Sequence, residues 1–335
     1  MNFITGASGF VGSYLAKKLI DRGEMVVSLK RPSTRMDLLG KYASQIKWYE
    51  GDILDVPSLE IAMKGVSKVF HCAAKISFDK KSRAIMYKVH AEGTANIVNV
   101  SLYHGIKKYL HVSSIAALPS PKHGETIDEN SEWSTNPYPA HYGKSKFMAE
   151  REAYRAMTEG INTIIVNPGT IIGAGFWHEG SGSFFSNIHK GLPFYTDGVV
   201  GFVDVRDVVD CMIQLMDSDI KNDKFILSGY NESFKNFFTA IAQKMNRKAP
   251  QYKVNKVLGE IAIASDFLQT LFTEHTRMIT SETIQLANLQ ANYDNSKIIN
   301  ALNYKFIPLD KTIKDTTEAF LQSVKLQKDF AVFEN

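Results

Sequence analysis

Apolar positions along the first two-thirds of the chain alternate between short β-branched runs and longer runs with helical spacing. Apolar residues recur every three or four positions from Val11 to Ile20 and from Ile85 to Leu102, which predicts amphipathic helices. The short runs predict buried strands at Asn2–Thr5, Met25–Leu29, Ile46–Glu50, Lys68–Ala73, Lys108–Ser113 and Thr163–Asn167. Strands that alternate with helices are typical of a parallel sheet, so the pattern predicts an α/β fold with a doubly wound parallel sheet.

The pattern changes after Pro168-Gly169. Residues 170–200 are rich in glycine and aromatic residues, and they predict irregular loops with one short helix. A helix is predicted at Asp204–Met216 and a strand at Lys224–Ser228. Further helices are predicted at Ser233–Asn246, Asn255–Phe272, Ser281–Gln290 and Leu309–Val324.

The composition is that of a globular protein that needs no disulfide or metal to fold. Of 335 residues, 44% are hydrophobic and 22% are charged, and a chain of this length can bury a large core. Lys and Arg number 39 against 35 Asp and Glu, a net charge of +4, which is weak evidence for a nucleic-acid partner. Cys72 and Cys211 lie far apart in apolar runs, which predicts two buried reduced thiols, and no Cys/His cluster has the spacing of a metal site.

We expect a cytoplasmic protein without an integral membrane segment. The longest apolar stretch, Val257–Phe272, is interrupted by Glu260 and Asp266 and is too short to span a bilayer. The chain runs from Met1 directly into a strand and a glycine turn, which leaves no room for a signal peptide. The apolar face of Ala262–Phe272 predicts either a homodimer contact or a cover over a cleft.

A glycine-rich turn lies between the first predicted strand and the first predicted helix. Glycines at such a turn let the backbone approach a pyrophosphate, and the helix N-terminus supplies N–H donors and a positive dipole. The residues expected to bind a dinucleotide here are Gly6, Ser8, Gly9, Phe10, Val11 and Gly12. We therefore expect residues 1–170, rejoined by 201–228, to form a Rossmann-type domain, and residues 171–335 to form a smaller, mostly helical substrate lobe.

The end of the second predicted strand indicates which dinucleotide is bound. An NAD site usually carries Asp or Glu there, but the segment Ser28–Arg35 has no carboxylate. It offers the cations Lys30, Arg31 and Arg35 and the hydroxyls of Ser33 and Thr34. These groups suit a 2′-phosphate, with Arg31 the best candidate because its planar fork matches phosphate geometry. NADP is thus expected in preference to NAD; the alternative is a solvated basic loop.

Candidate catalytic groups lie between residues 113 and 146. Tyr142 and Lys146 are four residues apart and share one helix face, where an ammonium would lower the pKa of a phenol. Ser113 and Ser114 follow a buried strand, at the edge where ligands bind in open α/β sheets. Each motif alone has a structural alternative: a chance match for the first and a strand-end turn for the serines.

Together these motifs resemble the extended short-chain dehydrogenases/reductases of the NAD-dependent epimerase/dehydratase superfamily. The shared segments are the glycine turn, Asp52-Ile53, Phe70 to Ala74, Ser113-Ser114, Tyr142 to Lys146, Asn167 to Gly169, Phe202 to Val208, and Tyr293 to Lys297 with Leu302 to Tyr304. The segment with Arg31 is similar to the dihydroflavonol-4-reductase-like branch. This resemblance implies an oxidoreductase.

The resemblance implies roles for matching positions. Tyr142 would be the general acid/base, Lys146 would lower its pKa and hold the nicotinamide ribose, and Ser114 would orient the substrate oxygen. Positions implied along the cofactor are Asp52, Ile53, Ala73, Ala74, Tyr142, Lys146 and Pro168. Asp52 would contact the adenine amino group, although a helix-capping role fits its position equally well.

One position departs from the family pattern. His90 lies where the family generally carries Asn, a residue linked there to proton relay or active-site architecture. His90 would bring a pH dependence near 6.5 if it replaced that relay. The alternative is a hydrogen bond within the helix.

These observations favour an NADP(H)-dependent reductase that interconverts a ketone or aldehyde and an alcohol. Aromatic residues expected in the substrate cleft favour a small lipophilic or aromatic substrate, although an interdomain core would explain about half of them: Phe176, Trp177, Phe184, Phe185, Phe194 and Tyr195. One alternative is a nucleotide-sugar epimerase or dehydratase with tightly bound NAD(P). Residues 229–335 contain only Arg247 and Arg277 as arginines, which argues against a sugar diphosphate. Another alternative is a non-catalytic NADP-sensing protein, against which the Ser114, Tyr142 and Lys146 set argues.

Overall fold

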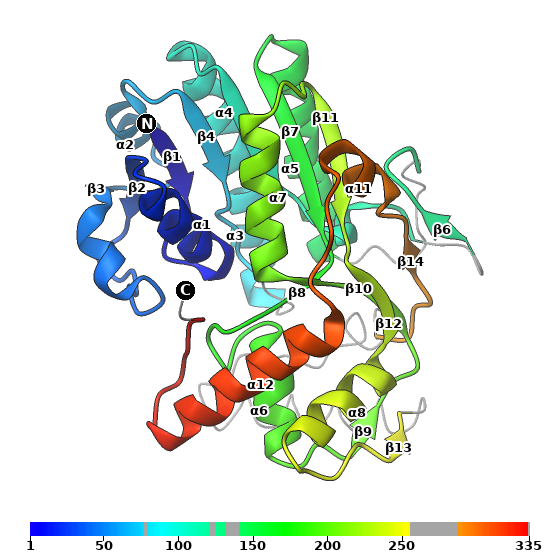
Figure 1. The fold of residues 1–335 in the computed structure, drawn as a ribbon. Helices are drawn as coiled ribbons and strands as arrows, with labels where there is room; N and C mark the ends of the chain where they lie inside the picture. The colour runs from blue at the N-terminus through cyan, green and yellow to red at the C-terminus, as the bar shows by residue number, and fades with distance from the viewer. Residues whose placement is uncertain (77–79, 121–124, 132–140, 255–286, 334–335) are drawn as a thin grey trace.

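The computed structural model describes residues 1–76, 80–120, 125–131, 141–254 and 287–333, and its largest feature is a parallel sheet of seven strands (Figure 1). In spatial order the strands are β11 (Asp223–Leu227), β7 (Asn162–Pro168), β5 (Lys108–Val112), β4 (Lys68–His71), β1 (Asn2–Thr5), β2 (Val26–Lys30) and β3 (Lys47–Glu50). The predicted doubly wound sheet is confirmed. Because the chain moves outward in both directions from β1, its topological switch point lies beside the carboxyl ends of β1 and β4.

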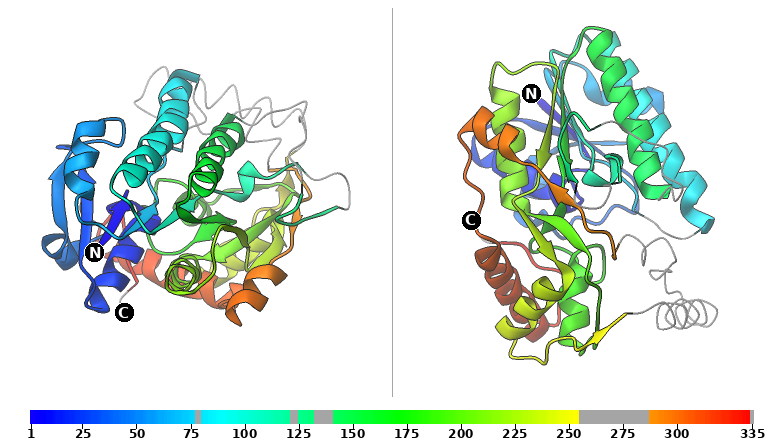
Figure 2. Two further views of the ribbon diagram at one scale, coloured as in Figure 1. Left: turned by 90° about the horizontal axis from the view of Figure 1, so that it is seen from above. Right: turned by 90° about the vertical axis from the view of Figure 1, so that its right-hand side faces the viewer.

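Helices cover both faces of this sheet, as the two views in Figure 2 show. One face carries α1 (Phe10–Asp21), α7 (Val205–Asp217) and α11 (Ser296–Leu302). The other face carries α2 (Val56–Met63), α4 (Gly93–Tyr103) and α5 (His141–Thr158). Each layer buries its own apolar cluster against the sheet, because the strands are apolar on both faces.

The helix predicted from Ile85 to Leu102 is interrupted. It consists of α3 (Arg83–Tyr87), a π-helical turn η3 (Lys88–Glu92) and α4, and it follows a short 3₁₀ turn, η2 (Lys80–Ser82). Within this stretch the Thr94 hydroxyl donates to the carbonyl oxygen of His90 at 2.5 Å. Single π turns are frequent at functional sites, and this one carries His90.

Residues 170–200 contain more regular structure than their composition predicts. A second sheet consists of β12 (Tyr230–Ser233), β10 (Val199–Asp204) and β8 (Thr170–Ile172), in which β10 is antiparallel to β12 and parallel to β8. These short strands pair with distant segments, so the local pattern did not predict them. The remaining short elements are η1 (Gly40–Gln45), η4 (Ile115–Ala117), β9 (Phe194–Tyr195) paired with β13 (Tyr252–Lys253), and β6 (Thr126–Ile127) paired with β14 (Asn292–Tyr293).

A third apolar cluster lies among α6 (Gly182–His189), α8 (Phe234–Lys244) and α12 (Leu309–Lys325), below the large sheet in Figure 1. The helix predicted at Asn255–Phe272, with its apolar face, lies outside the described residues. So does most of Ser281–Gln290; residues 287–290 form a turn and a bridge to Val199. Within the described ranges, no helix has the length and apolar character needed to cross a bilayer.

Candidate active site

The turn between β1 and α1 has close contacts that only glycine allows. Gly6 has a φ of +71°, and a Cβ atom there would lie 2.9 Å from the Cα of Ala73. A Cβ on Gly12 would lie 2.1 Å from the carbonyl oxygen of Gly6. α1 begins after Gly9, a residue without a side chain to cap the first N–H groups. The backbone N–H groups of this first turn and the positive end of the helix dipole are suited to binding a phosphate.

The other positions expected along the cofactor lie at the same edge of the sheet. Asp52 follows β3, Ala73 and Ala74 follow β4, and Pro168 ends β7. Ile53 is only 7% exposed, and it fills the space that the missing side chain of Gly93 leaves. Ile53 therefore contributes to this edge of the sheet mainly as a core residue.

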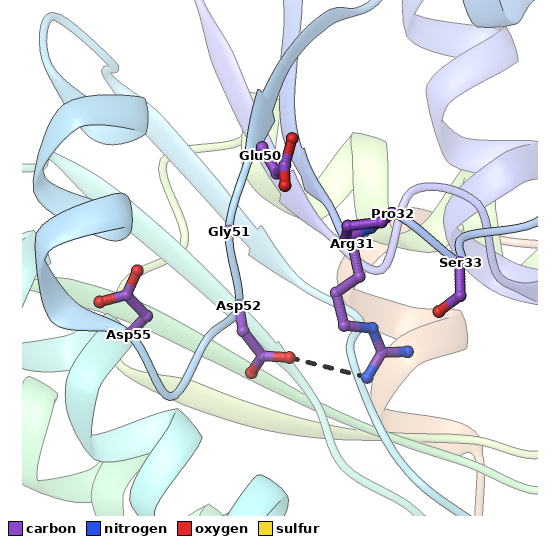
Figure 3. Close-up of a pocket in the computed structure, with 7 residues that line it drawn as sticks. All are labelled: Arg31, Pro32, Ser33, Glu50, Gly51, Asp52 and Asp55. Carbon is purple, nitrogen blue, oxygen red and sulfur yellow. Dashed lines mark ion pairs between the residues drawn. The ribbon is translucent and has the colours of Figure 1, made fainter.

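A pocket of about 540 Å³ opens where β2 and β3 end (Figure 3). It is lined by Arg31, Pro32, Ser33, Glu50, Gly51, Asp52 and Asp55. The Arg31 side chain points toward Asp52, and its Nη1 lies 3.6 Å from the Asp52 Oδ2. Folding thus brings a carboxylate to the segment Ser28–Arg35, which has none of its own. Because the Arg31 side chain is 67% exposed, it stays accessible to a second anion.

Arg35 does not line this pocket, contrary to the expectation that it faces the ribose phosphate. Its Nε donates to Asp37 at 2.8 Å, and its Nη2 donates to Asp329 at 3.1 Å. Its guanidinium carbon lies 4.4 Å from the ring centroid of Phe176. Thr34 does not line the pocket either. Its hydroxyl oxygen accepts from the Arg31 backbone N–H. Of the predicted phosphate ligands, the structure places Arg31 and Ser33 in the pocket.

Ser114 and Tyr142 meet beyond the carboxyl end of β5. Ser114 follows the strand and caps η4 by accepting from the Ala116 N–H at 3.1 Å. Tyr142 lies in the first turn of α5. Burial raises the pKa of Tyr142 to about 12, and a hydrogen bond with Ser114 lowers it in part. The predicted pair is brought together, and the tyrosine is a protonated phenol at neutral pH.

Lys146 lies one turn further along α5 and is 3% exposed. Its Nζ donates to the Val112 carbonyl oxygen at 2.7 Å. Burial lowers the pKa of Lys146 to about 8, and the Glu150 carboxylate opposes that change. In this arrangement burial of the phenol outweighs its neighbours and Lys146 is bound to the end of β5, so the lowering of the Tyr142 pKa by Lys146 stays a prediction.

A buried polar cluster surrounds the Lys146 ammonium. Burial, followed by the charge of Lys146, lowers the pKa of both His71 and His90 to about 3. Burial also lowers the pKa of His111, and it raises that of the half-buried Cys72 thiol to about 12. The histidines are therefore neutral at physiological pH and leave the ammonium as the cation of this cluster.

Glu150 is a buried carboxylate that the sequence motifs did not single out. It is 3% exposed and lies four residues after Lys146. Tyr142 and Lys146 are separated by the same interval, so the spacing could have placed Glu150 on the same helix face. Its Oε2 accepts from the Ser113 hydroxyl at 2.7 Å and from the Asn167 amide at 2.9 Å. Asn167 also donates to the Ser114 carbonyl oxygen at 2.9 Å. Glu150 thereby ties together the ends of β5 and β7.

Most of the aromatic residues expected in the cleft lie in the core instead. Trp177 and Phe185 are each 1% exposed and pack with Phe320 and Phe237 of the third cluster. Phe184 contacts three phenylalanines of α8, and Phe176 contacts Phe330 and Arg35. The aromatic pair of β9 remains, with Phe194 39% exposed and Tyr195 half-buried. Aromatic content alone therefore says little about the substrate.

Comparison with known sequences gives a match over most of the chain. Residues 2–227 match the model of the NAD dependent epimerase/dehydratase family. The chain is 30% identical over 260 residues to a Synechocystis protein provisionally named a dihydroflavonol 4-reductase, and the alignment covers 75% of this chain and 74% of that protein.

Comparison with solved structures agrees with the architecture. The protein gox2253 superposes with a TM-score of 0.81 at 28% identity, covering 96% of this chain and 98% of that chain. A UDP-glucose 4-epimerase from Thermotoga maritima, solved with UDP-glucose, has a TM-score of 0.78 at 20% identity over 97% of this chain and 100% of that chain. At that identity the second likeness shows the fold alone.

Proposed function

The chain belongs to the NAD dependent epimerase/dehydratase family, a group of extended short-chain dehydrogenases/reductases, and on that premise we propose that it is an NADP(H)-dependent reductase. The reaction interconverts a ketone or aldehyde and an alcohol. The observation that carries the proposal is the hydrogen bond between Ser114 and Tyr142 beside the buried Lys146, at the ligand-binding edge of the sheet. The Synechocystis relative, provisionally named a reductase, supports a reductase in preference to an epimerase.

The residues of the site have separate tasks in the reductive direction. Ser114 holds the substrate carbonyl oxygen, and Tyr142 donates its phenolic proton to that oxygen as the C=O bond becomes a C–O single bond. A bound nicotinamide dinucleotide supplies the hydride that the carbonyl carbon gains. With its pKa at about 12, Tyr142 carries the proton that reduction needs at neutral pH. Lys146 supports the phenolate that remains after the transfer.

The pocket at Arg31 supports NADP as the preferred dinucleotide. Arg31 and Ser33 offer a guanidinium and a hydroxyl to a phosphate, while Asp52 neutralises part of the guanidinium charge. We expect Arg31→Ala to weaken NADPH binding by about tenfold or more and NADH binding much less. Calorimetric titration of both dinucleotides measures this. Equal affinity for the two, unchanged in Arg31→Ala, would contradict NADP preference.

The catalytic part is tested by NADPH oxidation across aldehydes, ketones, acyl-CoA thioesters and steroid ketones, alongside UDP- and dTDP-sugars. We expect stoichiometric NADPH loss with a carbonyl substrate, and a rate reduced by about 10² to 10⁴ in Tyr142→Phe. NADPH affinity should change little in that variant, because the lost hydroxyl acts on the substrate. Conversion of a sugar nucleotide without net NADPH loss would instead indicate an epimerase. Binding without turnover of any compound in the panel would indicate a sensor.

The substrate proposal is a small lipophilic or aromatic carbonyl compound. It is supported by the scarcity of arginine, since only Arg247 and Arg277 occur in residues 229–335 to bind a diphosphate. Phe194, which is 39% exposed, gives further support, and its neighbour Tyr195 is half-buried. The sugar-nucleotide arm of the same panel tests this choice.

A further inference from the structure

The last described residues of the chain return to the large sheet. After α12, the segment Asp329–Phe333 runs beside the loop Gly173–Trp177 and ends near α1, as the red trace in Figure 1 shows. Phe330 forms an antiparallel bridge with Phe176. The Trp177 N–H donates to the Asp329 carbonyl oxygen at 2.9 Å, and the Ala331 N–H donates to the Gly175 carbonyl oxygen at 3.0 Å.

The loop Gly173–Trp177 is held from its other side by α1. The Tyr14 hydroxyl donates to the Ala174 carbonyl oxygen at 2.8 Å and accepts from the Phe333 N–H at 3.1 Å. A Cβ on Gly175 would lie 3.0 Å from the ring of Phe10, so the loop packs closely against the first turn of the phosphate-binding helix. The loop therefore lies between α1 and the C-terminal segment.

The same segment reaches the loop that carries Arg31. Asp329 pairs with Arg35 at 3.1 Å, and Arg35 also stacks on Phe176. Arg35 and Arg31 are four residues apart on one loop. The first part of that loop, Arg31 to Ser33, lines the pocket at the end of β2. One end of this loop thus faces the expected ribose phosphate, and the other is bound to the C-terminal segment.

An exposed ion pair alone contributes little, but Arg35 has three simultaneous partners. It bonds to Asp37 on its own loop and to Asp329, and it stacks on Phe176, which is itself bridged to Phe330. These contacts reduce the freedom of the loop before any ligand binds. A ligand that meets an ordered loop loses less affinity to ordering it.

We propose that the segment Asp329–Phe333 is a strap that preorders the cofactor-binding loop Arg31–Asp37 and thereby strengthens dinucleotide binding. This inference rests on the proposed function, because it takes the pocket at Arg31 to be the adenosine-ribose site. The strap also joins that loop to the loop Gly173–Trp177, so both loops share one support.

The test uses the full chain with Asp329→Asn, Arg35→Gln and both changes together, and a chain that ends at Gln327. The matched control is Asp310→Asn, which removes an exposed ion pair between α12 and Lys244 of α8. The probe is whichever of NADPH and NADH the wild type binds more tightly, measured by calorimetric titration. Thermal unfolding is measured for every variant.

We expect the Kd of the preferred dinucleotide to rise about fivefold in Asp329→Asn and about tenfold or more in the truncated chain. Asp329→Asn should add nothing when Arg35→Gln is already present, because Asp329 acts through Arg35. The control should bind as the wild type does.

An unchanged or lower Kd in both Asp329→Asn and the truncated chain would contradict the proposed strap. Additive effects of Asp329→Asn and Arg35→Gln on Kd would also contradict it. Truncation can lower stability, so Asp329→Asn decides where the two disagree. A wild type that prefers NADH would contradict the cofactor proposal alone. The strap would then be judged on NADH by the same comparison.

Discussion

The Nδ1 atom of His90 lies 2.8 Å from the hydroxyl oxygen of Ser145. The other ring nitrogen, Nε2, accepts from the backbone N–H of Lys75 at 3.1 Å, so the proton of the neutral ring belongs on Nδ1 and is donated to Ser145. Ser145 in turn donates to the Tyr142 carbonyl oxygen at 2.7 Å. This chain of hydrogen bonds connects the loop after β4 to the first turn of α5, where Tyr142 lies.

From this geometry we expect His90 to hold Tyr142 in place as a neutral group. Its pKa is lowered to about 3, first by burial and then by Lys146, so its charge does not change between pH 5 and 8. His90→Asn should therefore leave the shape of the pH–rate profile unchanged. His90→Leu should cost about 1 to 3 kcal/mol of unfolding free energy, because the Lys75 N–H and the Ser145 hydroxyl lose a partner. A step near pH 6.5 that disappears in His90→Asn would show a proton relay instead.

Glu150 should maintain the charge of Lys146. Removing the carboxylate removes the larger of the two influences that raise the pKa of Lys146 against burial, so that pKa falls below about 8. Since the ammonium is the form that supports the Tyr142 phenolate, Glu150→Gln should move the alkaline fall of kcat to lower pH by about one pH unit. The profile is measured with any substrate found in the NADPH oxidation screen.

The matched control for this change is Glu152→Gln, two residues along α5. Its carboxylate pairs with Arg155 on the outer side of the helix and is 29% exposed, so the alkaline fall should stay at the wild-type pH. An equal movement in both variants would show that Glu150 acts through the general charge of α5.

The two serines after β5 should separate into different roles. Ser114→Ala removes the hydroxyl that bonds Tyr142, so we expect kcat to fall about 10²-fold with little change in dinucleotide affinity. Ser113→Ala removes a donor to the buried Glu150, which should cost about 1 to 3 kcal/mol of stability. Steady-state kinetics and urea unfolding of both variants test this. The assignment of Ser114 fails if Ser113→Ala causes the larger loss of kcat.

Two substitutions in the glycine turn should differ in how far they disturb the packing of α1. A Cβ on Gly12 would lie 2.1 Å from the Gly6 carbonyl oxygen, whereas a Cβ on Gly9 would lie 3.3 Å from the same atom. Gly12→Ala must push α1 away from β1, so we expect loss of dinucleotide binding and a lower melting temperature. Gly9→Ala should lower the melting temperature much less. Calorimetric titration measures dinucleotide binding to Gly12→Ala, and thermal unfolding compares the stability of the two variants. Similar losses of stability would contradict the close packing at Gly12.

Asp207 should make stability depend on pH. It is 2% exposed, and its oxygens accept from the Tyr304 hydroxyl and the Ile307 N–H. Burial raises its pKa to about 6. Because this pKa lies above that of the unfolded chain, the contribution of the carboxyl to stability is full below about pH 4 and is lost as the pH rises through 6.

Asp207→Asn can keep both contacts, since its amide oxygen accepts from Ile307 and its NH₂ donates to Tyr304. Between pH 4 and 7.5 we therefore expect its stability to rise by about 2 to 3 kcal/mol relative to the wild type. Urea unfolding at the two pH values measures the difference. A constant difference would show that Asp207 is not the titrating group.

Local features of the sequence are sufficient to predict the large sheet, the glycine turn and the spacing of Tyr142 and Lys146. β-branched runs, glycine positions and a four-residue interval are local properties, and backbone geometry converts them directly into strands, a tight turn and one helix face. The family resemblance followed from the same local motifs in their order along the chain. Glu150, at the same interval after Lys146, was within reach of that reasoning.

The partner that each side chain contacts depends on how distant segments pack together. Arg35 and Asp329 are 294 positions apart, Asp52 reaches Arg31 from another strand, and Trp177 lies in a core that α12 closes. The sequence also could not show whether Lys146 contacts the Tyr142 phenol. In the structure the Lys146 ammonium donates to the Val112 carbonyl oxygen. A guanidinium, a carboxylate or an aromatic ring can satisfy its chemistry with many partners, and the packing of distant segments selects one of them.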